Sequence, residues 1–200
     1  MIKVRIPATS ANIGPGFDAL GVALGLYNYV YMEESDGLHI RSRDGAAIPL
    51  DETNLVYKTV RDLYARCGRS LRGLALEQIN HIPLARGLGS SSACIIGGLL
   101  GANEMMGGAL SQDEIINLAA VLEGHPDNST PALTGGLVTA VLDEGRVHYV
   151  KQEVGGELRL AAIIPDFELH TAEARAVLSS EVPHTHARFN FARATLLAVS

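Results

Sequence analysis

The segment from Pro83 to Ala93 constrains this chain more than any other, because two glycines and three serines stand where an extended run gives way to a helical pattern. Gly87 and Gly89 can adopt positive φ and let the backbone approach a ligand closely. The helix that follows directs unpaired N–H groups and its positive dipole end toward an anion. The segment lacks the Gly-Lys-Ser/Thr ending of a Walker A loop. Two interpretations remain: a phosphate-binding loop, or a glycine-rich turn in which a serine caps the helix.

The composition fits a globular enzyme without indicating which one. Of the 200 residues, 47% are hydrophobic, which is enough for the core of one large domain or slightly more. The formal net charge of −6 offers no basic face for a polyanion, so we expect no nucleic-acid partner. Cys67 and Cys94 have no cysteine or histidine at a metal-ligand or disulfide spacing. No apolar run approaches the ~20 residues of a membrane helix, so we expect a cytoplasmic protein without membrane association.

Hydrophobic periodicity predicts a mixture of strands and helices in the first three quarters of the chain. Strands are expected at residues 2–6, 27–32, 38–42, 74–80, 136–142 and 147–150, the last two as a hairpin around a four-residue loop at 143–146. One helix is expected from residue 53 or 54 to 67, and a second, buried on most sides, from 90 to the glycine pair at 107–108. A third is expected to run from a capping box at Ser111 and Glu114 to about residue 123.

A change of composition at residues 153–157 predicts a domain boundary, with one unit at 1–155 and a second at 156–200. In the second unit we expect a buried strand at residues 158–164, a short helix capped by Thr171 and running through Leu178, and a last helix from about Ala187. This unit is too small for an independent core of the usual size.

Glu123 lies at the end of the third predicted helix, where the negative end of the helix dipole makes an acidic residue mildly unfavourable. A residue that breaks a local rule is often functional. If this helix packs against the one that begins near Ser90, the carboxylate can join Ser91 in holding Mg²⁺ beside nucleotide phosphates. The alternative is a solvated carboxylate at a helix end.

Two polar loops are further candidates for a binding site. Asn12 and Asp18 flank a loop marked by glycine and proline, and His125, Asp127 and Asn128 form a polar turn. Loops of this composition are also common as ordinary solvated turns, so both interpretations stay open on these residues alone.

These residues also carry a resemblance to a known family. The GHMP kinases have a motif similar to Pro83-x-x-x-Gly87-Leu88-Gly89-Ser90-Ser91. Three more segments are similar, in the same order, to motifs of the homoserine kinases within that superfamily. They are residues 7–21 (PATSANIGPGFDALG), residues 123–136 (EGHPDN, then PALxGG) and residues 171–175 (TAEAR). The resemblance therefore covers the whole chain.

The resemblance implies an α+β GHMP kinase fold, with an N-terminal domain like the second domain of ribosomal protein S5 and an incomplete ferredoxin-like C-terminal domain. It implies a kinase with ATP and Mg²⁺ as cofactors that phosphorylates the side-chain hydroxyl of L-homoserine, a step in threonine biosynthesis. Catalysis in such enzymes is mostly positioning and charge stabilisation, so we assign no residue as catalytic base. A homodimer is left open.

The same resemblance implies a role for each matching residue. Asn54 would contact adenine, and the phosphates would be bound by Pro83, Arg86, Gly87, Leu88, Gly89, Ser90, Ser91 and Ser92. Ser91 and Glu123 would hold Mg²⁺. Homoserine would be bound by Asn12, Asp18, His125, Thr171 and Arg175. A guanidinium offers a planar two-donor fork to the substrate carboxylate, and the carboxylate of Asp18 suits the ammonium.

The chain departs from the homoserine kinases in two respects. These enzymes continue to a third, glycine-rich motif and to a further arginine, so the 200 residues are expected to be the front part of such a kinase with little or no turnover. Ser179 stands where the family commonly has proline. Two alternatives are another GHMP kinase, such as a mevalonate-type enzyme whose pocket needs no partner for an ammonium, and a nucleotide- or RNA-binding module without catalysis.

Overall fold

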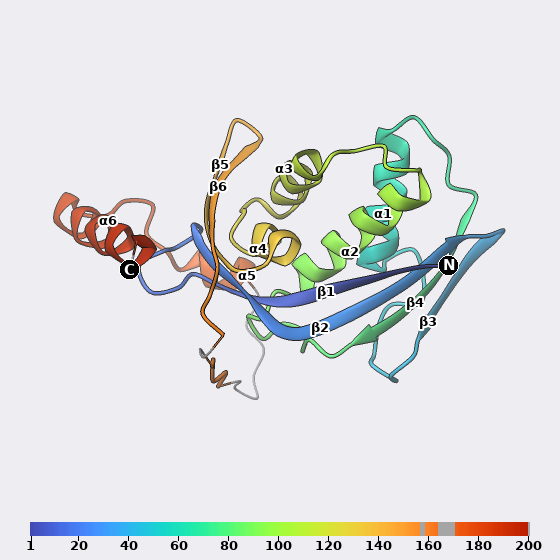
Figure 1. The fold of residues 1–200 in the computed structure, drawn as a ribbon, viewed down its shortest axis with the longest axis horizontal. Helices are drawn as coiled ribbons and strands as arrows, with labels where there is room; N and C mark the ends of the chain where they lie inside the picture. The colour runs from blue at the N-terminus through green and yellow to red at the C-terminus, as the bar shows by residue number, and fades with distance from the viewer. Residues whose placement is uncertain (157–158, 164–170, 200) are drawn as a thin grey trace.

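The computed structural model describes residues 1–156, 159–163 and 171–199, and it shows a six-stranded mixed sheet with helices on one face (Figure 1). The strands are β1 (Ile2–Ala11), β2 (Leu20–Glu34), β3 (Gly37–Ser42), β4 (Gly73–Asn80), β5 (Leu137–Asp143) and β6 (Arg146–Gln152). The helices are α1 (Leu55–Arg66), α2 (Ser90–Met105), α3 (Gln112–Glu123), α4 (Ser129–Thr134), α5 (Thr171–Ala176) and α6 (His184–Val199). The predicted α+β class is confirmed.

The long strand β2 organises the sheet. Its residues Gly21 and Val22 pair with both β1 and β5, so these two strands lie on opposite edges of β2. The C-terminal half of β2 pairs with β4 on the same edge as β5, and β3 adds to β4 in parallel. All the other pairings are antiparallel, including β5 with β6. The result is the strand order β3-β4-β2-β5-β6, with β1 alongside β2.

The core lies between the sheet and α2, and glycines allow the close approach. Ile6 on β1 and Met32 on β2 are completely buried on the helical face. A Cβ at Gly97 would lie 3.0 Å from the Ile6 side chain, and a Cβ at Gly101 would lie 2.2 Å from the Met32 sulfur. A larger residue at either position would require the buried Ile6 or Met32 side chain to repack, or α2 to move away from the sheet. The prediction of a small-residue helix buried on most sides is confirmed.

Local sequence signals set most helix ends as expected. Asn54 caps α1 by accepting hydrogen bonds from two backbone N–H groups, and Ser111 with Glu114 forms the predicted capping box of α3. The hairpin loop is shorter than the predicted four residues, because Asp143 pairs with Arg146. Glu144 and the glycine after it both have positive φ, as a two-residue type I′ turn requires.

Two expectations about secondary structure are wrong. The six-residue helix α4 was not predicted, because residues 124–136 have the composition of a loop and give no helical period of useful length. The buried strand expected at residues 158–164 is wrong over its described part, since residues 159–163 are exposed and in no strand. Hydrophobicity alone does not form a strand, and no strand of the described chain pairs with this segment. Residues 158 and 164 lie outside the described residues.

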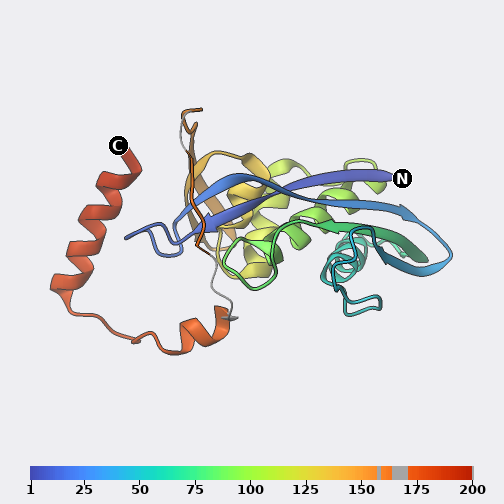
Figure 2. The same ribbon diagram turned by 90° about the horizontal axis from the view of Figure 1, so that it is seen from below.

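The last helix stands apart from the other helices (Figures 1 and 2). Its contacts with the rest include a 2.7 Å hydrogen bond from the Gln152 side chain to the Ala198 carbonyl. Phe189 and Phe191 on α6 are exposed. Both C-terminal helices differ from expectation at their ends, since α5 stops at Ala176 and α6 begins at His184. The domain boundary at residue 155 stays a prediction. In the described part of the chain no helix is both long and apolar enough to cross a membrane.

Candidate functional site

The predicted phosphate loop lies at the N-terminus of α2, where Leu88 is buried and Gly87 faces open space. Leu88 is buried, and its carbonyl accepts a 3.1 Å hydrogen bond from the Thr9 N–H. Gly87 has φ +69°, and a Cβ there would meet no atom within 4 Å. Ser91 is exposed on the first turn of α2, whereas Ser90 and Ser92 are buried. The helix N-terminus and the exposed glycine thus leave space in which an anion can approach backbone N–H groups.

Gly89 has a different reason for being glycine. A Cβ at this position would lie 2.0 Å from Thr9 Oγ1 and 3.3 Å from Asn128 Oδ1. The Thr9 hydroxyl itself donates to Asn128 Oδ1 over 2.8 Å. The end of β1, the loop before α2 and the start of α4 therefore meet at this residue. Glycine is required here by the packing of the protein, whether or not a phosphate binds.

Glu123 lies beside the start of α2, because α3 packs against α2 as expected. The Ser92 hydroxyl donates to Glu123 Oε1 over 2.6 Å, so the structure brings Ser92 and not the predicted Ser91 to this carboxylate. Glu123 Oε2 is buried and has no hydrogen-bond partner among the described residues. Burial raises the pKa of Glu123 to about 7. An unpaired buried carboxylate oxygen beside a hydroxyl fits the oxygen ligands that Mg²⁺ prefers.

A second cluster gathers charges from three distant segments. Arg175 on α5 donates two hydrogen bonds to Asp18, of 2.9 and 2.6 Å. His125 Nδ1 lies 2.6 Å from Asp127 Oδ1, and Asp127 is completely buried. One ligand atom each of Asp18, His125 and Asp127 lies within 4.8 Å of the others. The predicted substrate residues Asp18, His125 and Arg175 are thus close together, and Asp127 joins them.

The two clusters influence each other electrostatically. The hydrogen bond to Asp127 raises the pKa of His125, and the charge of Glu123 adds to that effect. The hydrogen bonds to Asp18 raise the pKa of Arg175. Residues 123–128 therefore carry the candidate magnesium ligand at one end and the charged cluster at the other.

The side chains of Asn12 and Asn54, both predicted to bind ligands, make hydrogen bonds within the protein. Asn12 Oδ1 accepts a 2.9 Å hydrogen bond from the Asp18 N–H, so it shapes the loop that presents Asp18. Asn54 is 2% exposed. Its Oδ1 accepts from two backbone N–H groups, while its Nδ2 donates to the Pro49 carbonyl and to Gln78. Both hydrogen-bonding groups of the amide are used within the protein, so none is left for adenine in this conformation.

The remaining predicted residues are placed as follows. Pro83 and Arg86 are partly buried and flank the loop on the N-terminal side of Gly87. Thr171 is the first residue of α5, but its side chain lies outside the described part of the structure. Asp127 was a candidate only as a member of the polar turn at 125–128, and no role was predicted for it. A turn rich in polar residues suggests solvent exposure, whereas α4 and its neighbours bury this carboxylate.

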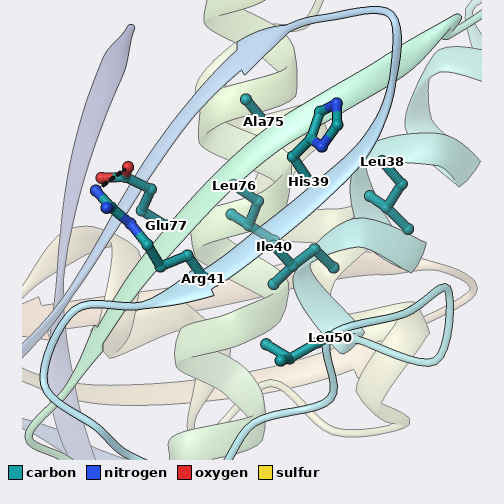
Figure 3. Close-up of a pocket in the computed structure, with 8 residues that line it drawn as sticks. All are labelled: Leu38, His39, Ile40, Arg41, Leu50, Ala75, Leu76 and Glu77. Atoms are coloured by element: carbon teal, nitrogen blue, oxygen red, sulfur yellow. Dashed lines mark hydrogen bonds and ion pairs between the residues drawn. The ribbon is translucent and has the colours of Figure 1, made fainter.

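One hollow of the surface lies away from both clusters. It has a volume of about 400 Å³ and is found where β3 and β4 meet the loop before α1. Figure 3 shows Leu38, Ile40 and Leu50 around it, with Arg41 paired to Glu77 at one end. None of the predicted site residues lines it. Its open wall combines aliphatic side chains with His39 and the Arg41–Glu77 ion pair.

Comparison with known proteins connects this geometry to a family. Residues 54–136 match the model of the GHMP kinases N-terminal domain. A homoserine kinase of Caldicellulosiruptor bescii is 52% identical over 200 residues, which are 99% of this chain and 65% of that protein. The crystal structure of homoserine kinase from Cytophaga hutchinsonii has a TM-score of 0.73 at 29% identity, over 96% of this chain and 64% of that one. The chain thus spans about 65% of the length of the first of these relatives.

The same fold occurs in a mevalonate kinase. The mevalonate kinase of Methanococcus jannaschii has a TM-score of 0.59 at 15% identity, over 78% of this chain and 56% of that one. At this identity the similarity concerns the fold alone.

Proposed function

Because this chain belongs to the GHMP kinases through its N-terminal domain, we propose that it acts as a homoserine kinase. It would transfer the γ-phosphoryl group of ATP to the side-chain hydroxyl of L-homoserine, in the cytoplasm, as a step of threonine biosynthesis. The observation that carries this proposal is the short segment 123–128. It links a carboxylate beside the α2 N-terminus to a cluster of opposite charges.

The nucleotide phosphates would lie at the loop of residues 87–92. The open position beside Gly87 and the N-terminus of α2 support this placement. Glu123 with Ser91 or Ser92 would hold Mg²⁺, since all these donors are oxygens and Glu123 Oε2 lacks a partner among the described residues. When bound, the ion neutralises charge on the phosphates.

The amino-acid substrate would lie at the charged cluster. Arg175 presents a planar fork for the α-carboxylate, and Asp18 presents a carboxylate for the α-ammonium. His125, held by the buried Asp127, can donate a hydrogen bond toward the same space. Asn12 supports the loop that carries Asp18. Transfer to a hydroxyl held in this way depends mainly on its position relative to the phosphate.

Direct binding measurements test this proposal. Isothermal titration of the chain with L-homoserine and with mevalonate, each with and without ATP, compares the two substrate classes. We expect L-homoserine to bind and mevalonate not to bind, because mevalonate has no ammonium for Asp18. Tighter binding of mevalonate than of L-homoserine would show that the substrate class is wrong. Binding of ATP with no binding of either alcohol would instead favour a nucleotide-binding module without this activity.

A further inference from the structure

We propose that Asp18, His125 and Asp127 form a binding site for a zinc-type divalent metal ion, and that this ion competes with Arg175 for Asp18. The inference stands on the geometry of these side chains and does not require the proposed kinase activity. It concerns a place distinct from the oxygen-lined position of Glu123 and Ser92.

The three side chains have the right atoms at nearly the right separations. One ligand atom of each lies within 4.8 Å of the other two. A tetrahedral zinc ion with bonds of about 2.0–2.2 Å brings its ligand atoms to about 3.4 Å from one another. The widest separation can exceed this value by up to about 1.4 Å. Movement of Asp18 and His125, the two partly exposed side chains, would have to close that gap, and Asp18 lies on a loop.

The buried carboxylate of Asp127 points independently to a cation. Asp127 is completely buried, and its Oδ2 has no hydrogen-bond partner within the described ranges of the chain. A buried carboxylate oxygen without a donor is costly, so such an atom is normally paired with a donor or a positive charge. His125 contacts only the other oxygen, and the hydrogen bonds of Arg175 in this cluster go to Asp18, so its charge acts on Asp127 without a hydrogen bond to Oδ2. A bound cation would supply the missing partner.

The set of donors selects the kind of ion. Imidazole nitrogen with two carboxylates suits Zn²⁺, whereas Mg²⁺ prefers oxygen ligands in an octahedron. Solvent can reach the site, because the side chain of Asp18 is 33% exposed and that of His125 is 17% exposed. Arg175 is its internal competitor, since its guanidinium already neutralises Asp18.

This competition predicts opposite effects for zinc and for an amino-acid ligand. Removal of the guanidinium frees Asp18 and should strengthen zinc binding. The same change should weaken binding of an amino acid, whose carboxylate loses its partner. A simple loss of structure would weaken both.

The test is a calorimetric titration of the chain with zinc chloride at pH 7.5. His125→Gln and Asp127→Asn should each weaken zinc binding by about tenfold to 100-fold. Arg175→Gln should strengthen it by about two- to fivefold, the range expected for release of a partly exposed ion pair. His39→Gln, which removes an exposed histidine on β3, is the matched control and should change nothing. Magnesium chloride in excess should not displace the zinc.

Circular dichroism of every variant separates loss of binding from loss of folding. If Asp127→Asn does not fold, His125→Gln and Arg175→Gln still decide the question, since neither residue is completely buried. Native zinc affinity in folded His125→Gln would overturn the site. Unchanged or weaker zinc binding in folded Arg175→Gln would overturn the competition with Arg175. Neither outcome would bear on L-homoserine binding, which is measured separately.

Discussion

Arg175 donates two hydrogen bonds to Asp18, a residue 157 positions earlier in the chain, so the two ends of the sequence meet in one bidentate ion pair. These are the two residues expected to bind the opposite charges of an amino acid. In the ligand-free chain they neutralise each other. A zwitterionic substrate can therefore replace one internal ion pair with two, without leaving either charge unpaired.

Replacement of Arg175 by lysine tests this relationship. Arg175→Lys keeps the charge but loses the planar fork, so we expect L-homoserine binding to weaken by about 1.5–3 kcal/mol, roughly 10- to 100-fold. ATP binding should be unchanged, because the residue lies at the charged cluster and not at the α2 loop. Isothermal titration with each ligand measures both effects. An L-homoserine affinity equal to that of the native chain would contradict the carboxylate role.

The two glycines of the phosphate loop should respond differently to substitution. Gly87→Ala adds a Cβ in open space at positive φ, so we expect a stability loss of about 1 kcal/mol and weaker ATP binding. Gly89→Val should destabilise the whole domain by more, because its side chain would overlap Thr9. Urea denaturation with ATP titration separates the two effects. Full ATP affinity in Gly87→Ala would argue against phosphate at this loop.

The metal role of Glu123 can be measured through the two forms of the nucleotide. Glu123→Gln keeps the shape but removes the charge, so we expect Mg²⁺-ATP to lose about tenfold in affinity and Mg²⁺-free ATP to lose little. Ser91→Ala and Ser92→Ala form a matched pair that identifies which hydroxyl accompanies the carboxylate. Equal weakening of both nucleotide forms in Glu123→Gln would place the metal elsewhere.

Stability should fall as the pH rises in the absence of metal. Burial raises the pKa of Glu123 to about 7 from a value near 4.5 when unfolded, so its contribution is complete below pH 4.5 and is lost as the pH rises through 7. Contact with Asp127 also raises the pKa of His125, whose contribution is likewise complete below its usual pKa and lost at higher pH. Both groups therefore act in the same direction.

The urea midpoint at pH 5.5 and at pH 8 measures this effect. We expect a lower midpoint at pH 8 in the native chain and a smaller difference in Glu123→Gln. Added Mg²⁺ should restore part of the loss at pH 8, because the ion favours the ionised carboxylate. A difference that is the same in Glu123→Gln and in the native chain would show that Glu123 does not titrate in this range.

The sequence predicted those elements whose signals are local. Alternation and residue composition located β3 and β4, but only residues 2–6 of β1 and 27–32 of β2, because the residues from 9 to 18 have the composition of a loop. The capping residues Asn54 and Ser111 marked the starts of α1 and α3. Local signals could not predict the conformation of residues 159–163, since a hydrophobic run becomes a strand only where another strand pairs with it. Helix α4 was missed because its stability comes from packing against α2, α3, β1 and β2 and not from its own six residues.

The candidate site was predictable in its residue types but less so in its contacts. The glycine-serine loop and Glu123 were found because they break local rules or match a motif. The choice between Ser91 and Ser92 depends on the rotation of α2 relative to α3, which only the packed structure provides. Asp127 could not be separated from its polar neighbours, because burial of one side chain in a turn is a property of tertiary structure.

Gly101, near the C-terminal end of α2, affects the anion-binding turn at the other end of the helix. Gly101 lies eleven residues after Ser90, or about 16 Å along the axis. A methyl group there would meet the Met32 sulfur at 2.2 Å, so either the buried Met32 side chain must repack or α2 must move away from β2. Movement of the helix would also shift the backbone N–H groups at its first turn. The position of a bound anion is thus set partly by a residue that never approaches it.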